Sequence, residues 1–201
     1  MSEVRDSQVE ERFGQALESI KSGTGSELQQ ACEWLILGWR EAPVLQMLSL
    51  KKQLERLGLE QRESMLEEAL ISVAEKRPGP FLDIASDPSN RLWGQAVEIL
   101  SMLADPSVLD LLLSLESRCE EKELPAFIRA LGNFNDPRAA EALQKYLRSE
   151  EDHLFIEAVM ALRRAGGNAA LAHMKSALAH RNNSVAASSE ILKAVIAELG
   201  G

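Results

Sequence analysis

The sequence predicts an all-α protein, a right-handed α-solenoid of about six antiparallel helix pairs. Three observations lead to this fold class. Apolar residues recur at the three-and-four spacing of a buried helix face along nearly the whole chain. No segment shows the alternating apolar pattern of a half-buried strand. Turns and leucines in the second half return every 31 residues, and such a period with two helices per unit is typical of helical repeats.

Composition and charge limit the classes of function. The 201 residues are 45% hydrophobic, enough for a substantial core in one domain or two small ones. The 31 acidic and 22 basic residues give a net charge of −9, which opposes nucleic-acid binding. A polar, charged start and no apolar run long enough for a membrane span favour a cytoplasmic protein that does not bind membranes. Cys32 and Cys119 fit two reduced thiols.

The first two helices are expected on either side of the break SGTGS, residues 22–26. Ser7 and Glu10 are placed as a capping box at the start of the first helix, and Ser26 can cap the second. The predicted buried residues are Val9, Phe13, Ala16, Leu17 and Ile20 in the first helix, and Leu28, Ala31, Cys32, Leu35, Ile36 and Trp39 in the second.

The next helix pair is predicted between Pro43 and the segment KRPGP, residues 76–80. Gly58 is a plausible left-handed cap between the two helices. The predicted buried residues are Val44, Met47, Leu48, Leu50, Leu54 and Leu57, then Leu66, Ala69, Leu70 and Val73. KRPGP is the best candidate boundary, so we expect divergent helical repeats over residues 1–78 and a regular repeat array over residues 79–201.

The regular array is predicted from a recurring turn. Asp105-Pro106 and Asp136-Pro137 are 31 residues apart, and the same step leads to Gly167 in a third turn. An Asp side chain can accept from free N–H groups of a first helical turn, and Pro fixes φ near the helical value. Apolar residues keep this register: Leu112, Leu143 and Met174 in the first helices, and Leu100, Leu131 and Leu162 at the ends of the second helices.

The stretch ALGNFNDPRAAEALQKYL, continued by EAVMALRRAGG, resembles HEAT-like repeats of the short bacterial type that occurs in phycobilisome lyase subunits. The resemblance is most specific from Asp136 to Gly167, is fair from Pro80 to Gly201 and is weak before Pro80. It implies repeats over residues 79–104, 105–135, 136–166 and 167–201, with the second helix of each repeat on the concave face.

Catalytic and metal-binding patterns are not found in the sequence. A related family of di-iron hydroxylases carries His-Glu pairs, but no Glu follows His153, His173 or His180. Cys119 is flanked by carboxylates, which disfavour a thiolate. The acidic cluster at residues 149–152 is explained by the positive end of the helix that starts there. We therefore predict neither a catalytic site, nor a cofactor, nor a metal.

Two pairs of apolar residues are candidate partner-binding sites. Ile156 and Met160 lie four apart in the helix predicted at residues 152–165, away from its buried stripe of Phe155, Ala158, Val159 and Leu162. The alternative is that the pair fills the seam between two repeats. Trp34 and Leu37 lie beside the buried stripe of their helix and could anchor a partner or a second copy of the chain. The alternative is that the next helix pair covers them.

The leading hypothesis is a non-enzymatic scaffold or adaptor that binds another protein, with self-association through the N-terminal helices as a further expectation. The alternative is a bilin lyase or a chaperone-like partner in the attachment of bilin chromophores to phycobiliproteins. Only the repeat type suggests that alternative, and fold analogy alone does not transfer function.

Overall fold

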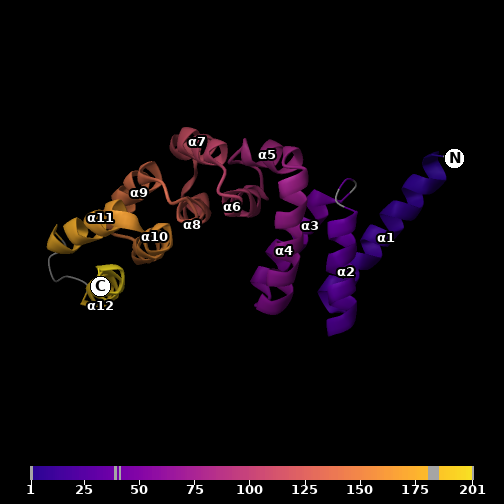
Figure 1. Ribbon diagram of the computed structural model, residues 1–201, viewed down its shortest axis with the longest axis horizontal. Helices are drawn as coiled ribbons and strands as arrows, with labels where there is room; N and C mark the ends of the chain where they lie inside the picture. Colours follow the sequence, from indigo (N-terminus) through magenta and orange to yellow (C-terminus); the bar gives the residue numbers. More distant parts are fainter. Residues whose placement is uncertain (1, 39, 41, 181–185, 201) are drawn as a thin grey trace. The chain divides into compact units, whose positions relative to one another are not determined.

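A computed structural model describes residues 2–38, 40, 42–180 and 186–200, with side chains over 11–38, 40, 42–179 and 190–199. In these residues the secondary structure consists of α-helices and short 3-10 segments, without a strand (Figure 1). Over this described part of the chain, twelve α-helices follow one another as six pairs, which confirms the prediction of an all-α solenoid.

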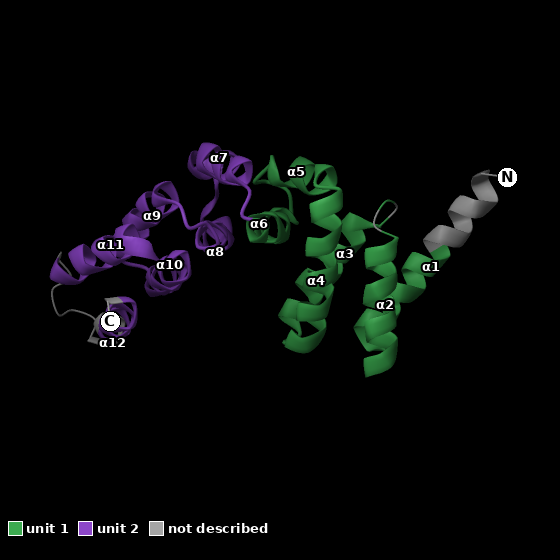
Figure 2. Ribbon diagram, in the orientation of Figure 1, with its two compact units in different colours: residues 1–103 green, residues 104–201 purple. Residues whose placement is uncertain are grey.

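The chain divides into two compact units, residues 1–103 and 104–201 (Figure 2). Unit 1 contains α1 (Ser2–Ser22), α2 (Gly25–Leu37), α3 (Val44–Arg56), α4 (Glu60–Lys76), α5 (Gly79–Ala85) and α6 (Trp93–Met102). Unit 2 contains α7 (Pro106–Leu115), α8 (Leu124–Leu131), α9 (Pro137–Gln144), α10 (Asp152–Ala165), α11 (Gly167–His180) and α12 (Ala186–Gly200). Its 3-10 segments are η1 (Glu116–Arg118), η2 (Glu121–Glu123) and η3 (Lys145–Arg148).

Helix pairs stack on one another within each unit. In unit 1, α2 contacts α4 and α4 contacts α6, while α1 contacts α3. In unit 2, α8 contacts α10 and α10 contacts α12, while α9 contacts α11. Second helices therefore lie against second helices within each unit, and α1 with α3 and α9 with α11 show the same contact between first helices, which is the arrangement expected of stacked repeats.

The compact units divide at Leu103, whereas the predicted change of repeat type lies at residues 78 and 79. The KRPGP segment interrupts the helices only briefly, since α4 ends at Lys76 and α5 begins at Gly79. The division into divergent repeats over residues 1–78 and regular repeats over residues 79–201 stays a prediction.

The recurring turns of unit 2 are built as the sequence predicts. Asp105 precedes α7 and accepts from the N–H of Ser107 at 2.8 Å, and Asp136 precedes α9 and accepts from the N–H of Arg138 at 2.8 Å. The third turn has Gly166 and Gly167 at φ values of 64° and 76°. Their left-handed backbone is favourable for glycine and strained for other residues.

The leucine register is also confirmed. The two sets of residues at 31-residue spacing are fully buried: Leu112, Leu143 and Met174, and Leu100, Leu131 and Leu162. Gly132 follows Leu131 where α8 meets α10, and a Cβ placed on it would lie 2.7 Å from Ala161 Cα. A side chain at residue 132 would therefore force these two helices apart.

Five details of the first two pairs differ from the predictions. The first helix begins at Ser2, not near Ser7, because no glycine or proline precedes Gly14 to stop it. Thr24, not Ser26, precedes α2, and the Glu27 carboxylate accepts from its N–H and its hydroxyl. Leu57 is 64% exposed because α3 ends at Arg56, while Leu17 and Ile36 are only half-buried. Trp39 and the side chain of Val9 lie outside the described part of the chain.

Candidate protein-interaction surface

Exposed apolar side chains occur in unit 2 on α10 and α12. Ile156 and Met160 lie one turn apart on α10 and are 37% and 40% exposed. On α12, Ile191 is 37% exposed. These three residues differ from the buried stripe of α10, where Phe155, Ala158, Val159 and Leu162 are fully buried as predicted. Ile156 and Met160 are therefore accessible to a partner, and neighbouring repeats cover them only in part.

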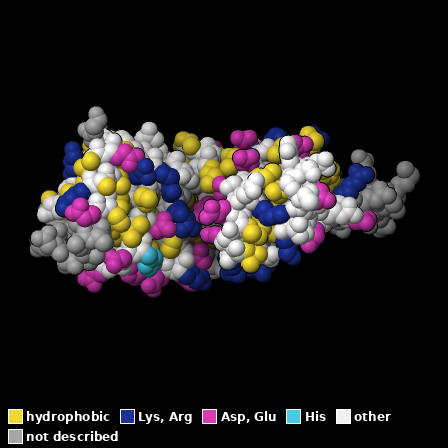
Figure 3. Space-filling view, turned by 90° about the horizontal axis from the view of Figure 1, so that it is seen from below, with side chains coloured by type: hydrophobic (Ala, Val, Ile, Leu, Met, Phe, Trp, Pro, Cys, Tyr) yellow, Lys and Arg dark blue, Asp and Glu magenta, His cyan; other side chains and the backbone are white. Residues whose placement is uncertain are grey.

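The repeat register places three exposed or half-exposed residues in one row. Arg129, Met160 and Ile191 are 31 residues apart and lie on α8, α10 and α12, which contact one another in that order. We call the side of unit 2 that these helices form the second-helix face. Figure 3 views the side on which these helices lie in Figure 1, and hydrophobic side chains gather on the part from unit 2, beside basic and acidic ones.

Ion pairs join the three helices on both sides of Met160. Arg129 on α8 contacts Glu157 on α10 at 3.2 Å, and Arg163 on α10 contacts Glu198 on α12 at 2.7 Å. The guanidinium of Arg164 donates to the backbone carbonyl of Arg129 at 3.0 Å. Exposed ion pairs contribute little to stability individually, but they restrict how neighbouring helices can shift. The apolar side chains are therefore carried on linked helices.

A shallow depression of about 560 Å³ lies where α8 and α10 begin. Its lining includes Lys122, Pro125 and His153. Pro125 corresponds to Ile156 in the repeat register, and His153 precedes Ile156 by one helical turn. The imidazole of His153 is exposed, with its Nε2 3.4 Å from a carboxylate oxygen of Glu151. The depression therefore lies at the start of α10, about one helical turn before Ile156.

Trp34 and Leu37 lie in unit 1, whereas the second-helix face belongs to unit 2. The Trp34 ring packs against Phe13 of α1, with ring centroids 4.5 Å apart, and is half-buried. Leu37, at the end of α2, is 80% exposed. The two residues therefore differ in character, because Trp34 contributes to the contact between α1 and α2 whereas Leu37 contacts little of the described protein.

The thiols are poorly suited to nucleophilic chemistry. Cys32 is buried and Cys119 is half-buried, and both are free of disulfides. Burial raises the pKa of each thiol to about 11, helped by Glu68 near Cys32 and by Glu123 and Glu116 near Cys119. Near neutral pH both cysteines are therefore protonated, and the thiol is a much weaker nucleophile than the thiolate.

The acidic cluster before α10 is local structure. The Ser149 hydroxyl accepts from the N–H of Glu151 at 3.1 Å, and Asp152 opens the helix.

In the part of the chain that the structure describes, no three His, Cys, Asp or Glu side chains gather as a metal site would require. None of the described helices combines the length and the apolar content that a membrane span needs.

A family model described as HEAT repeats matches residues 117–193. This segment is HEAT-like. The match extends from the end of η1 into α12 and therefore includes Arg129, Met160 and Ile191. Comparison of the chain with curated proteins gave no match. The matching model describes HEAT repeats in general, so the closer resemblance to phycobilisome lyase subunits stays a prediction.

The sequence missed Ile191 as a candidate site residue. The signal was present, because the 31-residue step that relates Leu131 to Leu162 also leads from Met160 to Ile191. The predicted pair Ile156 and Met160 lies on the same face as Ile191, whereas Trp34 and Leu37 belong to the other unit.

Proposed function

We propose that the protein is a non-enzymatic scaffold or adaptor whose second-helix face binds an apolar segment of another protein. The observation that carries this proposal is the exposure of Ile156, Met160 and Ile191 on contacting helices of the HEAT-like segment. Exposed apolar side chains that cluster on a surface are typical of interaction sites. Methionine adapts its shape to a partner more easily than branched residues do.

The ion pairs beside these apolar side chains favour binding without rearrangement. Arg129 with Glu157 and Arg163 with Glu198 hold α8, α10 and α12 together before a partner arrives. A preorganised surface loses less conformational freedom on binding, so more of the contact energy appears as affinity. The charged groups would also form a polar rim around the apolar contact, as is usual at protein interfaces.

A non-enzymatic role agrees with the protonated thiols of Cys32 and Cys119. The net charge of −9 supports a protein partner over a nucleic acid, and we propose the cytoplasm as the location. The alternative role in bilin attachment rests on the repeat type alone.

The second-helix face can be tested by substitution with polar residues. We expect Ile156→Ser with Met160→Ser to abolish recovery of the partner protein that the wild type captures from the source cells. The matched control is Leu57→Ser with Leu59→Ser, which removes two exposed leucines from unit 1. Loss of the same partner with the control pair, or its retention with the α10 pair, would show that binding occurs elsewhere.

We further propose that Leu37 supports self-association through the N-terminal helices, because a leucine with 80% exposure is a favourable contact for a second copy. Leu37→Ser should shift sedimentation toward the monomer without lowering the melting temperature. Trp34→Ala is a less specific test, since it also removes the contact with Phe13. A wild-type protein that sediments as a monomer at all concentrations would contradict this proposal.

A further inference from the structure

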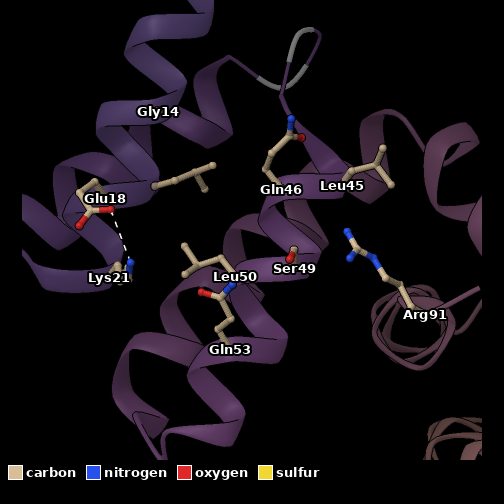
Figure 4. A pocket seen from close by; sticks show the side chains of 10 residues that line it. Gly14, Glu18, Lys21, Leu45, Gln46, Ser49, Leu50, Gln53 and Arg91 are labelled. Atoms are coloured by element: carbon tan, nitrogen blue, oxygen red, sulfur yellow. Dashed lines mark ion pairs between the residues drawn. The ribbon is translucent and has the colours of Figure 1, made fainter.

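A groove runs between α1 and α3 in unit 1, separate from the surfaces considered above (Figure 4). Its volume is about 520 Å³. Three leucines give the groove its apolar lining: Leu50 is buried, Leu17 is half-buried and Leu45 is 56% exposed. The remaining lining includes neutral polar side chains of α3 and charged side chains of α1 and of the loop before α6. The groove is thus amphipathic.

Gly14 forms part of the α1 wall. Glycine is the poorest helix former after proline, yet α1 continues through this residue. A Cβ placed on Gly14 would meet no atom within 4 Å, so the fold of the described residues does not require glycine there. The missing side chain leaves room for another backbone to approach α1 closely, which is a common reason for glycine in a regular element.

The charges of the groove are unequal. Glu18 and Lys21 on α1 lie 3.9 Å apart and balance one another. Arg91 reaches the groove from the loop before α6, and Figure 4 shows its guanidinium extended toward the α3 side. The Lys52 ammonium donates to the backbone carbonyl of Arg91 and so ties this loop to α3. The groove therefore carries an excess positive charge in a chain whose net charge is −9.

We propose that this groove binds an amphipathic helical segment of a partner protein that carries a carboxylate opposite Arg91. Apolar side chains of the segment would cover Leu17 and Leu45, and its backbone would come closest to α1 at Gly14. An acidic segment complements Arg91, whereas a basic one would be repelled. This site is independent of the second-helix face, because it lies in the other unit and uses a charged contact.

Two synthetic peptides provide the test. Both form an amphipathic helix with leucines on one face, and they differ only in carrying glutamates or lysines beside that face. Fluorescence anisotropy with the full chain should show binding of the acidic peptide and not of the basic one. Arg91→Glu should weaken binding of the acidic peptide by roughly tenfold and should permit binding of the basic one. Arg56→Glu, an exposed residue of α3 outside the groove lining, is the control and should change neither.

Gly14 supplies a steric test that does not depend on charge. Gly14→Phe should block the acidic peptide, while Gly14→Ala should retain most binding and raise the melting temperature, since alanine favours the helix. Melting temperatures of all variants show whether each is folded. The proposal is overturned if the acidic peptide does not bind, if both peptides bind equally, or if Gly14→Phe leaves binding intact. A wild-type dimer that Gly14→Phe converts to a monomer would identify a second copy as the occupant and would also overturn it.

Discussion

Lys51 is a charged residue at a position where the apolar pattern of α3 places the core. Its side chain is 3% exposed, and its ammonium contacts Glu63 at 2.9 Å, Glu67 at 3.2 Å and Glu98 at 3.6 Å. Burial alone would lower the pKa of Lys51, but Glu98, Glu63 and Glu67 outweigh burial and raise the pKa above its ordinary 10.5. One buried cation therefore joins α3 to α4 and to α6.

Lys51→Met should destabilise the protein by about 3 to 5 kcal/mol near neutral pH, because it leaves three partly buried carboxylates without their cation. Since the pKa of Lys51 is raised in the folded protein, the charged ammonium contributes fully to stability below about pH 10.5. This contribution is lost as the pH rises through the pKa of Lys51 in the folded protein. Urea denaturation should therefore show the difference between wild type and variant shrinking above about pH 10.5. Lys76→Met, at an exposed residue of α4, is the control and should stay within about 0.5 kcal/mol.

At the scale of elements, the Asp-Pro turns combine a cap with a charge. Ser107 donates to Asp105 through its hydroxyl and its N–H, and these bonds lower the pKa of Asp105. Arg138 donates to Asp136 through its guanidinium and through its backbone N–H. These bonds lower the pKa of Asp136, and the guanidinium has the larger effect. The Arg138 guanidinium also contacts Asp110 on α7 at 2.6 Å. The turn before α9 is thereby joined to the preceding repeat.

Asp105→Asn with Asp136→Asn should keep the shape of both caps while removing their charge. The pKa of each Asp is lower in the folded protein than its ordinary value of 3.8, so the ionised carboxylates stabilise the folded state above that value. This stabilisation is lost as the pH falls through the folded pKa, and the wild type should therefore lose stability in acid. Thermal denaturation should show a smaller fall in melting temperature for the variant between about pH 5 and about pH 3. Asp83→Asn, at an exposed residue of α5, should follow the wild type. Parallel curves for wild type and double variant would contradict the role of these charges.

The elements that could be predicted from the sequence are those fixed by local chemistry. Asp105, Asp136 and the buried leucines follow from capping and helical periodicity, which act over a few residues. The exposure of Leu57 depends on where α3 ends, and the burial of Lys51 depends on which helices cover α3. Periodicity contains neither kind of information. The groove beside Gly14 was missed for the same reason, since its walls come from α1, α3 and the loop at Arg91.

At the scale of the whole molecule, the sequence predicted the stacking of helix pairs but not the division into compact units. A stack of repeats offers similar contacts at every junction, so the apolar pattern does not reveal where contacts are weaker. The candidate surface shows the same limit. The sequence distinguishes Ile156 and Met160 from the buried stripe of α10. Whether they are exposed, however, depends on where α8 and α12 lie.

Leu162→Ala tests both the register and the division into units. This residue is fully buried, so the change should cost about 2 to 5 kcal/mol, whereas Met160→Ala on the same helix should cost less than about 0.5 kcal/mol. Hydrogen exchange should show the lost protection mainly in the amides of α8, α10 and α12, because energetic effects in stacked repeats are strongest between neighbours. An equal loss of protection in α2 and α4 would indicate that both units unfold together.

The row of Arg129, Met160 and Ile191 also has a consequence for how such a surface evolves. Each repeat contributes one side chain to the row at an interval of 31 residues. Duplication of a gene segment that encodes one repeat would lengthen the row by one position and preserve the contacts between neighbours. Insertion of a single codon within α10 would instead rotate every later residue of that helix by about 100° and displace the side chains of those residues from the row. The length of the surface can therefore change by whole repeats, while its chemistry changes by point substitution at one position per repeat.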